Sequence, residues 1–178
     1  DKAGWEEQFY HALEDFKFLP AGRITAGAGT GRSVTLFNCF VMGDIEDSLD
    51  GIFQALRESA LTMQMGGGIG LDFSTLRPAG VRTRRVGVIA SGPVSFMHVW
   101  DAMCATICST GSRRGAMMAT LRCDHPDIEE FIECKVKEEK KAWALIDAGY
   151  DGSFNVRGGA YDSVFFQNAN NSVRVTDE

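Results

Sequence analysis

The stretch Gly66-Gly67-Gly68-Ile69-Gly70-Leu71-Asp72-Phe73 decides the fold class of this 178-residue chain. Before it, apolar residues recur at helical spacing over residues 49–63, and Asp47 and Ser48 offer an N-cap. Gly66 stands where a left-handed C-cap would end that helix. Residues 69–73 then have the character of a short strand. The stretch therefore predicts a helix that turns at glycine directly into a strand.

The same alternation extends in both directions along the chain. The expected strands cover 34–42, 69–73, 116–123 and 172–176, and the expected helices between them cover 49–63, 94–108 and 126–138. A further helix over 5–16 precedes the first strand, and the charged residues that follow 135 are expected to lead into a loop. Strands that alternate with helices favour an α/β fold with a largely parallel sheet.

Composition and charge exclude several classes of protein. The chain has 18 Lys and Arg against 24 Asp and Glu, a formal net charge of −6, which disfavours non-specific binding to nucleic acid or to an anionic membrane. No apolar run approaches the ~20 residues that span a bilayer, and no signal peptide is expected. Five cysteines without a C-x-x-C motif indicate a reducing, cytoplasmic compartment, and the three histidines do not gather near them, so no metal site is expected.

Four features of the sequence could carry chemistry, and each also has a purely structural interpretation. The glycine run could present backbone N–H groups to an anion, or it could serve only as a helix cap and a turn. Arg77 and Arg84 could bind phosphate, or they could lie in a solvated loop. The basic segment 111–115 could be a mobile connection, and Cys39 could be an unreactive apolar residue of a buried strand. From the residues alone, these alternatives stay open.

Taken together, the motifs resemble one family, the large catalytic subunit of ribonucleotide reductase. The matching runs are collinear and cover nearly the whole chain: 18–23, 38–41, 47–52, 66–74, 76–78, 91–97, 113–118, 125–128, 131–132 and 167–177. The sequences of these runs are most similar to those of the adenosylcobalamin-dependent class II enzymes. The resemblance therefore implies adenosylcobalamin as the cofactor, with binding residues that are not assignable in this chain.

The resemblance also implies a fold. The family fold is a ten-stranded α/β barrel made of two half-barrels. Residues 34–178 are then expected to form the first half-barrel, and residues 1–33 a helical or loop lead-in to it. The chain would be the N-terminal part of the catalytic barrel of a longer protein, and the isolated chain is expected to be inactive.

The chemistry implied by the resemblance is the reduction of ribonucleotides to 2′-deoxyribonucleotides by thiyl-radical chemistry. Cys39 matches the first member of the pair of reducing cysteines. A thiol suits this role because it can be oxidised to a disulfide, which a thioredoxin-type or glutaredoxin-type partner reduces again by exchange. Asn38 and Gly68 match positions that line the ribose and the phosphate of the substrate.

Other residues match the allosteric parts of the family. The residues at effector-binding positions are Asp47, Ser48, Leu49, Arg77 and Arg84, the two arginines on the loop that holds the effector phosphates. Arg114 matches the specificity loop between the effector and the substrate base. In the family the effector site lies at a dimer interface, so the full-length protein is expected to be a homodimer.

Two alternatives remain beside the class II interpretation. A class I ribonucleoside-diphosphate reductase would use the same chemistry at Cys39, with a radical generated by a separate protein. A non-catalytic regulatory domain would keep the nucleotide site and lose the chemistry. Dependence on cobalamin separates the first alternative from class II, and the presence of Cys39 within its motif disfavours the second.

Overall fold

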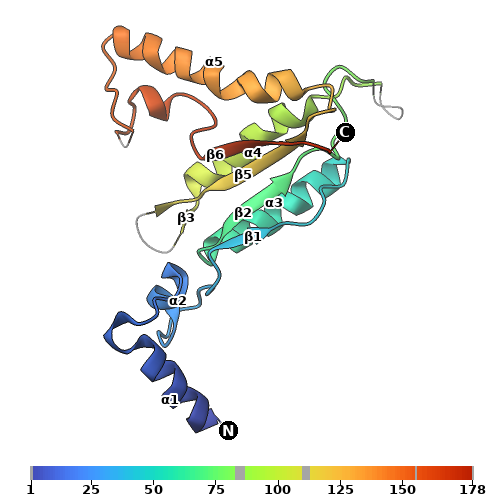
Figure 1. Cartoon of the computed structure of the whole chain (residues 1–178). Helices are drawn as coiled ribbons and strands as arrows, with labels where there is room; N and C mark the ends of the chain where they lie inside the picture. The colour runs from blue at the N-terminus through green and yellow to red at the C-terminus, as the bar shows by residue number, and fades with distance from the viewer. Residues whose placement is uncertain (1, 83–86, 110–112, 155, 178) are drawn as a thin grey trace.

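Four parallel strands lie side by side in one sheet (Figure 1). This computed structural model describes residues 2–82, 87–109, 113–154 and 156–177. The order across the sheet is β1-β2-β5-β6, and every neighbouring pair is parallel. The strands of this sheet are β1 (Cys39–Val41), β2 (Gly68–Asp72), β5 (Met117–Arg122) and β6 (Ala169–Arg174). The predicted α/β fold with a largely parallel sheet is confirmed.

Helices join successive strands of the sheet. The three connecting helices are α3 (Leu49–Gln64), α4 (Gly92–Thr106) and α5 (Ile128–Asp147). The predicted caps of α3 are confirmed, because the Ser48 hydroxyl accepts a hydrogen bond from the backbone N–H of Gly51 at 3.0 Å and Gly66 has a left-handed φ of 94°. The short helices are α2 (Gly22–Gly27), η1 (Glu14–Phe16) and η2 (Ala160–Asp162).

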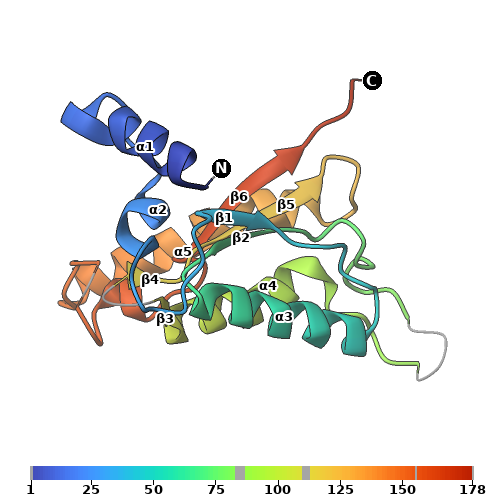
Figure 2. The same ribbon diagram turned by 90° about the horizontal axis from the view of Figure 1, so that it is seen from below.

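The helices cover one face of the sheet and leave the other open. Along β5, Met117, Ala119 and Leu121 are buried, whereas Met118 between them is 48% exposed. Figure 2 shows α3 and α4 together on one side of the sheet, and α5 packs beside α4. Large apolar side chains such as Trp100 and Phe131 fill the space beneath the buried face. Alternate residues of each strand therefore face either a dry core or an open surface.

The N-terminal segment lies away from this core. Helix α1 (Lys2–Leu13) buries none of its residues and projects away from the sheet (Figure 1). The predicted helix over 5–16 is interrupted, because Asp15 and Phe16 adopt positive φ values of 54° and 58°. After Pro20 the chain forms the short helix α2. The division into 1–33 and 34–178 stays a prediction.

The largest differences from the expected boundaries are in β1 and α5, and β6 also starts and ends earlier than the expected 172–176. The strand expected over 34–42 is ordered as β1 only over Cys39–Val41, because Thr35 donates its backbone N–H to the Met65 carbonyl after α3 and not to a strand. The charged stretch expected to lead into a loop is part of α5. There Lys137 lies 2.9 Å from Glu133 one turn earlier, and Ala142 is buried on the inner face.

Part of the basic segment after α4 is paired as a strand, and residues 110–112 lie outside the described residues. Backbone pairing of β3 (Cys108–Ser109) with β4 (Arg113–Arg114) is antiparallel and makes a small hairpin between α4 and β5. In the ranges that the structure describes, no helix has the length and apolar character needed to cross a membrane.

Candidate functional site

Cys39 and Gly68 are directly paired across β1 and β2. The backbone N–H of Gly68 donates to the Asn38 carbonyl at 2.8 Å, which fixes the start of both strands. A Cβ atom at Gly68 would lie 3.3 Å from the Cys39 Sγ and 3.4 Å from the Asn38 carbonyl oxygen. The three residues predicted to contact substrate are therefore neighbours, and the missing side chain at Gly68 leaves space next to the thiol.

The Cys39 side chain is exposed, contrary to the expectation of a buried strand. β1 is an edge strand, and Val41, two residues on and facing the same way, is 96% exposed. Cys104 gives the contrast. It is fully buried in α4 with its Sγ 3.8 Å from the Met63 Sδ, and burial raises the pKa of its thiol to about 12. A thiol so placed is protected from redox partners, whereas Cys39 is accessible to them.

The Asn38 side chain has a second, local contact. Its Oδ1 accepts a hydrogen bond from the backbone N–H of Arg23 in α2 at 3.3 Å. This contact connects the N-terminal segment to the beginning of β1.

Asp47 and Arg77 form the centre of a second region at the opposite end of α3. The Arg77 Nε lies 2.8 Å from the Asp47 Oδ2, and its Nη2 donates to the Asp47 carbonyl at 2.9 Å. The Thr75 hydroxyl donates to the Ile45 carbonyl at 2.6 Å, which holds the segment after β2 against the segment before α3. The two residues predicted to bind effector thus contact each other through loops that are tied together.

A cavity of about 710 Å³ lies beside this ion pair. Its described lining includes four predicted effector residues, Asp47, Ser48, Leu49 and Arg77, together with the apolar Val88, Ile89 and Phe96. Ser48 precedes α3, and Ser91 and Gly92, which also line the cavity, lie where α4 begins. The N-termini of two helices, which favour negative charge, therefore border the same space as a guanidinium group.

The remaining predicted residues are only partly placed. Arg84 lies outside the residues that the structure describes. Arg114 lies in β4, where its backbone pairs with Cys108. Helix α3 connects the two regions, because it starts at Leu49 beside the cavity and ends at Gln64, just before the glycine run that faces Cys39.

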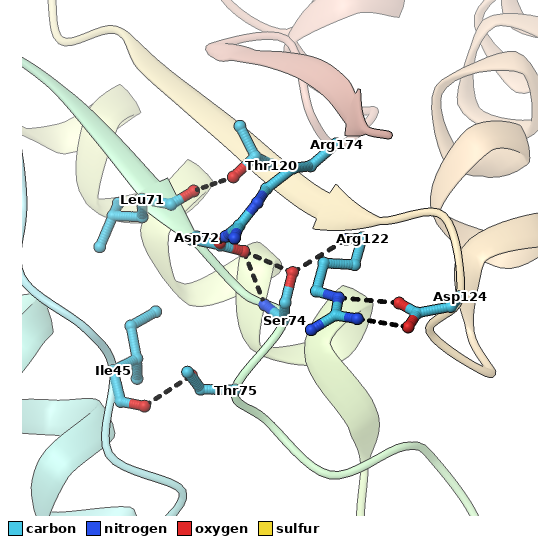
Figure 3. Close-up of polar contacts among 9 residues, drawn as sticks. All are labelled: Ile45, Leu71, Asp72, Ser74, Thr75, Thr120, Arg122, Asp124 and Arg174. Carbon is cyan, nitrogen blue, oxygen red and sulfur yellow. Dashed lines mark hydrogen bonds and ion pairs between the residues drawn. The ribbon is translucent and has the colours of Figure 1, made fainter. Parts of the chain in front are cut away.

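A polar network at the carboxyl ends of the strands was not expected from the sequence (Figure 3). Arg174 of β6 pairs with the Asp72 carboxylate of β2, and the Ser74 backbone N–H donates to Asp72 at 3.0 Å. The Ser74 hydroxyl in turn accepts the backbone N–H of Arg122 at 2.8 Å. Burial raises the pKa of Asp72, but the bonds from Ser74 and Arg174 outweigh it and hold that pKa below its usual value. The charged residue at the end of each of these strands, Asp72, Arg122 and Arg174, was the signal that could have revealed it.

A buried carboxylate orders the chain that enters β6. The Asp101 side chain, 5% exposed, accepts backbone N–H groups from Phe166 at 2.7 Å and from Asn168 at 3.0 Å. Phe166 is held there with a left-handed φ of 61°. Across the described ranges, no group of three or more His, Cys, Asp or Glu side chains is arranged to hold a metal ion.

Comparison with known proteins identifies the family. The profile of the ribonucleotide reductase barrel domain matches residues 37–178. The chain is 47% identical over 141 residues to a vitamin B12-dependent ribonucleotide reductase of Rhodopirellula baltica, covering 79% of this chain and 13% of that protein. It is 42% identical over 175 residues to the protein of that name from Streptomyces clavuligerus, covering 98% of this chain and 18% of that protein. The chain thus spans less than a fifth of the length of these curated relatives.

A solved structure agrees with the fold. The class Id ribonucleotide reductase alpha subunit of Actinobacillus ureae superposes with a TM-score of 0.65 at 20% sequence identity, covering 97% of this chain and 26% of that one. At this identity the likeness supports the fold of the chain. The chain belongs to the ribonucleotide reductase barrel-domain family.

Proposed function

We propose that the protein containing this chain reduces ribonucleotides to 2′-deoxyribonucleotides, with Cys39 as one of the two cysteines that supply the electrons. The observation that carries the proposal is the exposed Cys39 thiol on the open sheet face, beside the space left by Gly68. The ribose 2′ carbon loses its hydroxyl as water and gains a hydrogen, while two thiols become one disulfide. The two thiol hydrogens, one in water and one on carbon, balance the step.

The thiyl-radical start of the reaction and the class II assignment are also part of this proposal. The vitamin B12-dependent names of the relatives support adenosylcobalamin, which supplies the initiating radical when it is bound. The described residues offer no assignable ligand for it: both ring nitrogens of His125, for example, contact backbone groups, Leu76 O at 2.9 Å and Asp127 N at 3.1 Å. A thioredoxin-type or glutaredoxin-type protein would re-reduce the disulfide by thiol exchange.

Allosteric control is proposed at the cavity beside Asp47 and Arg77. Phosphates suit this space because a guanidinium and the N-termini of α3 and α4 border it. The apolar wall of Val88, Ile89 and Phe96 suits the face of a nucleotide base. The expected homodimer and the role of Arg114 in substrate choice extend the same proposal.

The decisive experiment is Cys39→Ser in the full-length enzyme. The hydroxyl is close in size to the thiol but cannot form a disulfide, so steady-state reduction with a dithiol should be abolished while effector binding stays nearly unchanged. Cys123→Ser is the matched control, since Cys123 is also a free, exposed cysteine. Retention of most of the rate in Cys39→Ser would show that Cys39 has no redox role. Loss of turnover in both variants would point to a general defect.

A further inference from the structure

We propose that Gly67 is a positioning residue for the Cys39 thiol and acts through the ring of Phe40. This inference rests on the proposed redox role of Cys39. A methyl group at Gly67 would lie 2.6 Å from the Phe40 Cε2 and 2.7 Å from its Cδ2, closer than side-chain atoms pack. It would also lie 3.1 Å from the Cγ2 of Thr62. The ring of Phe40 therefore occupies the place that any other residue at 67 would need.

Position 67 requires glycine because there is no space for a side chain, and not because of its backbone conformation. Gly66 has a positive φ of 94°, which side chains disfavour, but Gly67 is not among the residues with positive φ. Its backbone N–H donates to the Thr62 carbonyl at 3.1 Å, an arrangement open to other residues. The absence of a side chain at Gly67 thus serves the approach of Phe40.

A displaced Phe40 would displace Cys39. The two residues are adjacent in β1, so the Phe40 ring lies on the helix side of the sheet and Cys39 on the open side. β1 has only three residues and a single partner strand, which leaves few hydrogen bonds to resist a shift. The ring is further held by Phe37, with centroids 6.0 Å apart in an edge-on arrangement. Packing of Phe40 on Gly67 is therefore a principal contact that fixes the position of the thiol.

Gly67 differs in this respect from Gly68 and Gly70, the two glycines of β2. At Gly68 the nearest atoms to an added Cβ are 3.3 and 3.4 Å away, and at Gly70 they are 3.8 and 4.0 Å away. Gly67 is therefore the most tightly packed of these positions.

The test uses Gly67→Ala, Phe40→Val and the double variant in the full-length enzyme. Valine lacks both ring atoms that clash, so it makes room for the new methyl group. Gly43→Ala, just beyond β1, is the matched control because an added Cβ there meets nothing within 4 Å. Two quantities are measured: kcat and KM with a dithiol, and the rate of Cys39 alkylation by iodoacetamide without nucleotide, followed by peptide mass spectrometry.

Gly67→Ala should lower kcat by about 10- to 100-fold with KM nearly unchanged, since a small misplacement of a reacting group has effects of this size. It should also change the alkylation rate of Cys39, and Gly43→Ala should change neither quantity. The double variant should have a higher kcat than Gly67→Ala alone. Wild-type kcat and alkylation in Gly67→Ala would overturn the inference, as would a double variant no better than Gly67→Ala.

Two further outcomes are also decisive. If Gly67→Ala does not fold, recovery of a folded, alkylatable protein in the double variant supports the inference, and failure to recover overturns it. If Cys39→Ser keeps its activity, the proposed function fails. The alkylation rates still report separately whether Gly67 positions the thiol.

Discussion

Arg77 contacts Asp47 through three hydrogen bonds, although 30 positions separate the two residues. The backbone N–H of Arg77 donates to the Asp47 Oδ1 at 3.3 Å, its Nε donates to Oδ2 at 2.8 Å, and its Nη2 donates to the Asp47 carbonyl at 2.9 Å. Both side chains remain about one-third exposed, at 37% and 35%. An ion pair this exposed contributes at most about 1 kcal/mol to stability, so its arrangement at the cavity matters more than its strength.

Arg77→Ala should weaken the binding of all nucleotide effectors to a similar extent, because phosphate is common to them. The loss of charge-assisted bonds worth about 1.5–3 kcal/mol each predicts at least a roughly 10-fold rise in Kd. The thermal unfolding midpoint should change little, since the ion pair with Asp47 is about one-third exposed and contributes little to stability. Equilibrium binding of each effector to the full-length protein measures the effect. Arg122→Ala, which removes an exposed arginine paired with Asp124, should leave effector Kd unchanged.

Arg114→Ala should reduce the dependence of substrate choice on the effector, with a smaller loss of effector affinity than in Arg77→Ala. Arg114 lies in the short hairpin between α4 and β5, and an effector that favours one hairpin conformation would place it for one substrate base. Competition between substrates, measured with each effector in turn, tests this. The neighbouring Arg113→Ala is the control, since it removes the same charge from the same strand. Unchanged preferences in Arg114→Ala would identify the hairpin as a connector.

His98 should make the protein less stable as the pH falls below neutrality. Its ring lies 4.4 Å from the rings of both Phe165 and Phe166, and burial lowers its pKa below 6.5 despite the nearby Glu138 and Asp101. A depressed pKa means that the folded state favours the neutral ring. The contribution of neutral His98 to the free energy of unfolding is therefore complete above pH 6.5. It is lost as the pH falls through the lower pKa that His98 has in the folded state.

The measurement is the unfolding midpoint of the full-length protein between pH 7.5 and 5. His98→Gln should flatten the fall that the wild type undergoes in this range. His11→Gln, which changes a histidine on the exposed helix α1, should keep the wild-type slope. Identical slopes in all three proteins would mean that His98 titrates alike in the folded and unfolded states.

The order of the elements could be predicted because the local signals agree with the tertiary structure. Ser48 as N-cap and Gly66 as C-cap delimit α3 in the sequence and in the structure. The end of α5 could not be predicted in this way. The sequence predicted a helix only to 138, but the pairing of Lys141 with Glu138 and the buried Ala142 continue the helix to Asp147. The length of β1 depends on which residues find a partner strand, and no local pattern reports this.

The sequence predicted which residues form the candidate site better than it predicted their exposure and contacts. The motifs singled out Cys39 and Gly68, and the structure makes them partners across two strands. The pattern around Cys39 is apolar, so it indicated burial, but an edge position in an open sheet leaves the thiol exposed. Nothing in the sequence indicated that Arg77 would contact Asp47, because that contact depends on how two distant loops are joined. The functional roles of these residues stay predictions.

Helix α3 also determines how far the cavity lies from the glycine run. Its 16 residues span about 24 Å at the usual rise per residue, from Leu49 beside the cavity to Gln64 before the glycine run. The proposed effector and substrate sites lie at these two ends. In the proposed function, the two nucleotides are therefore separated by the length of the helix. One can affect the binding of the other only by moving the protein between them.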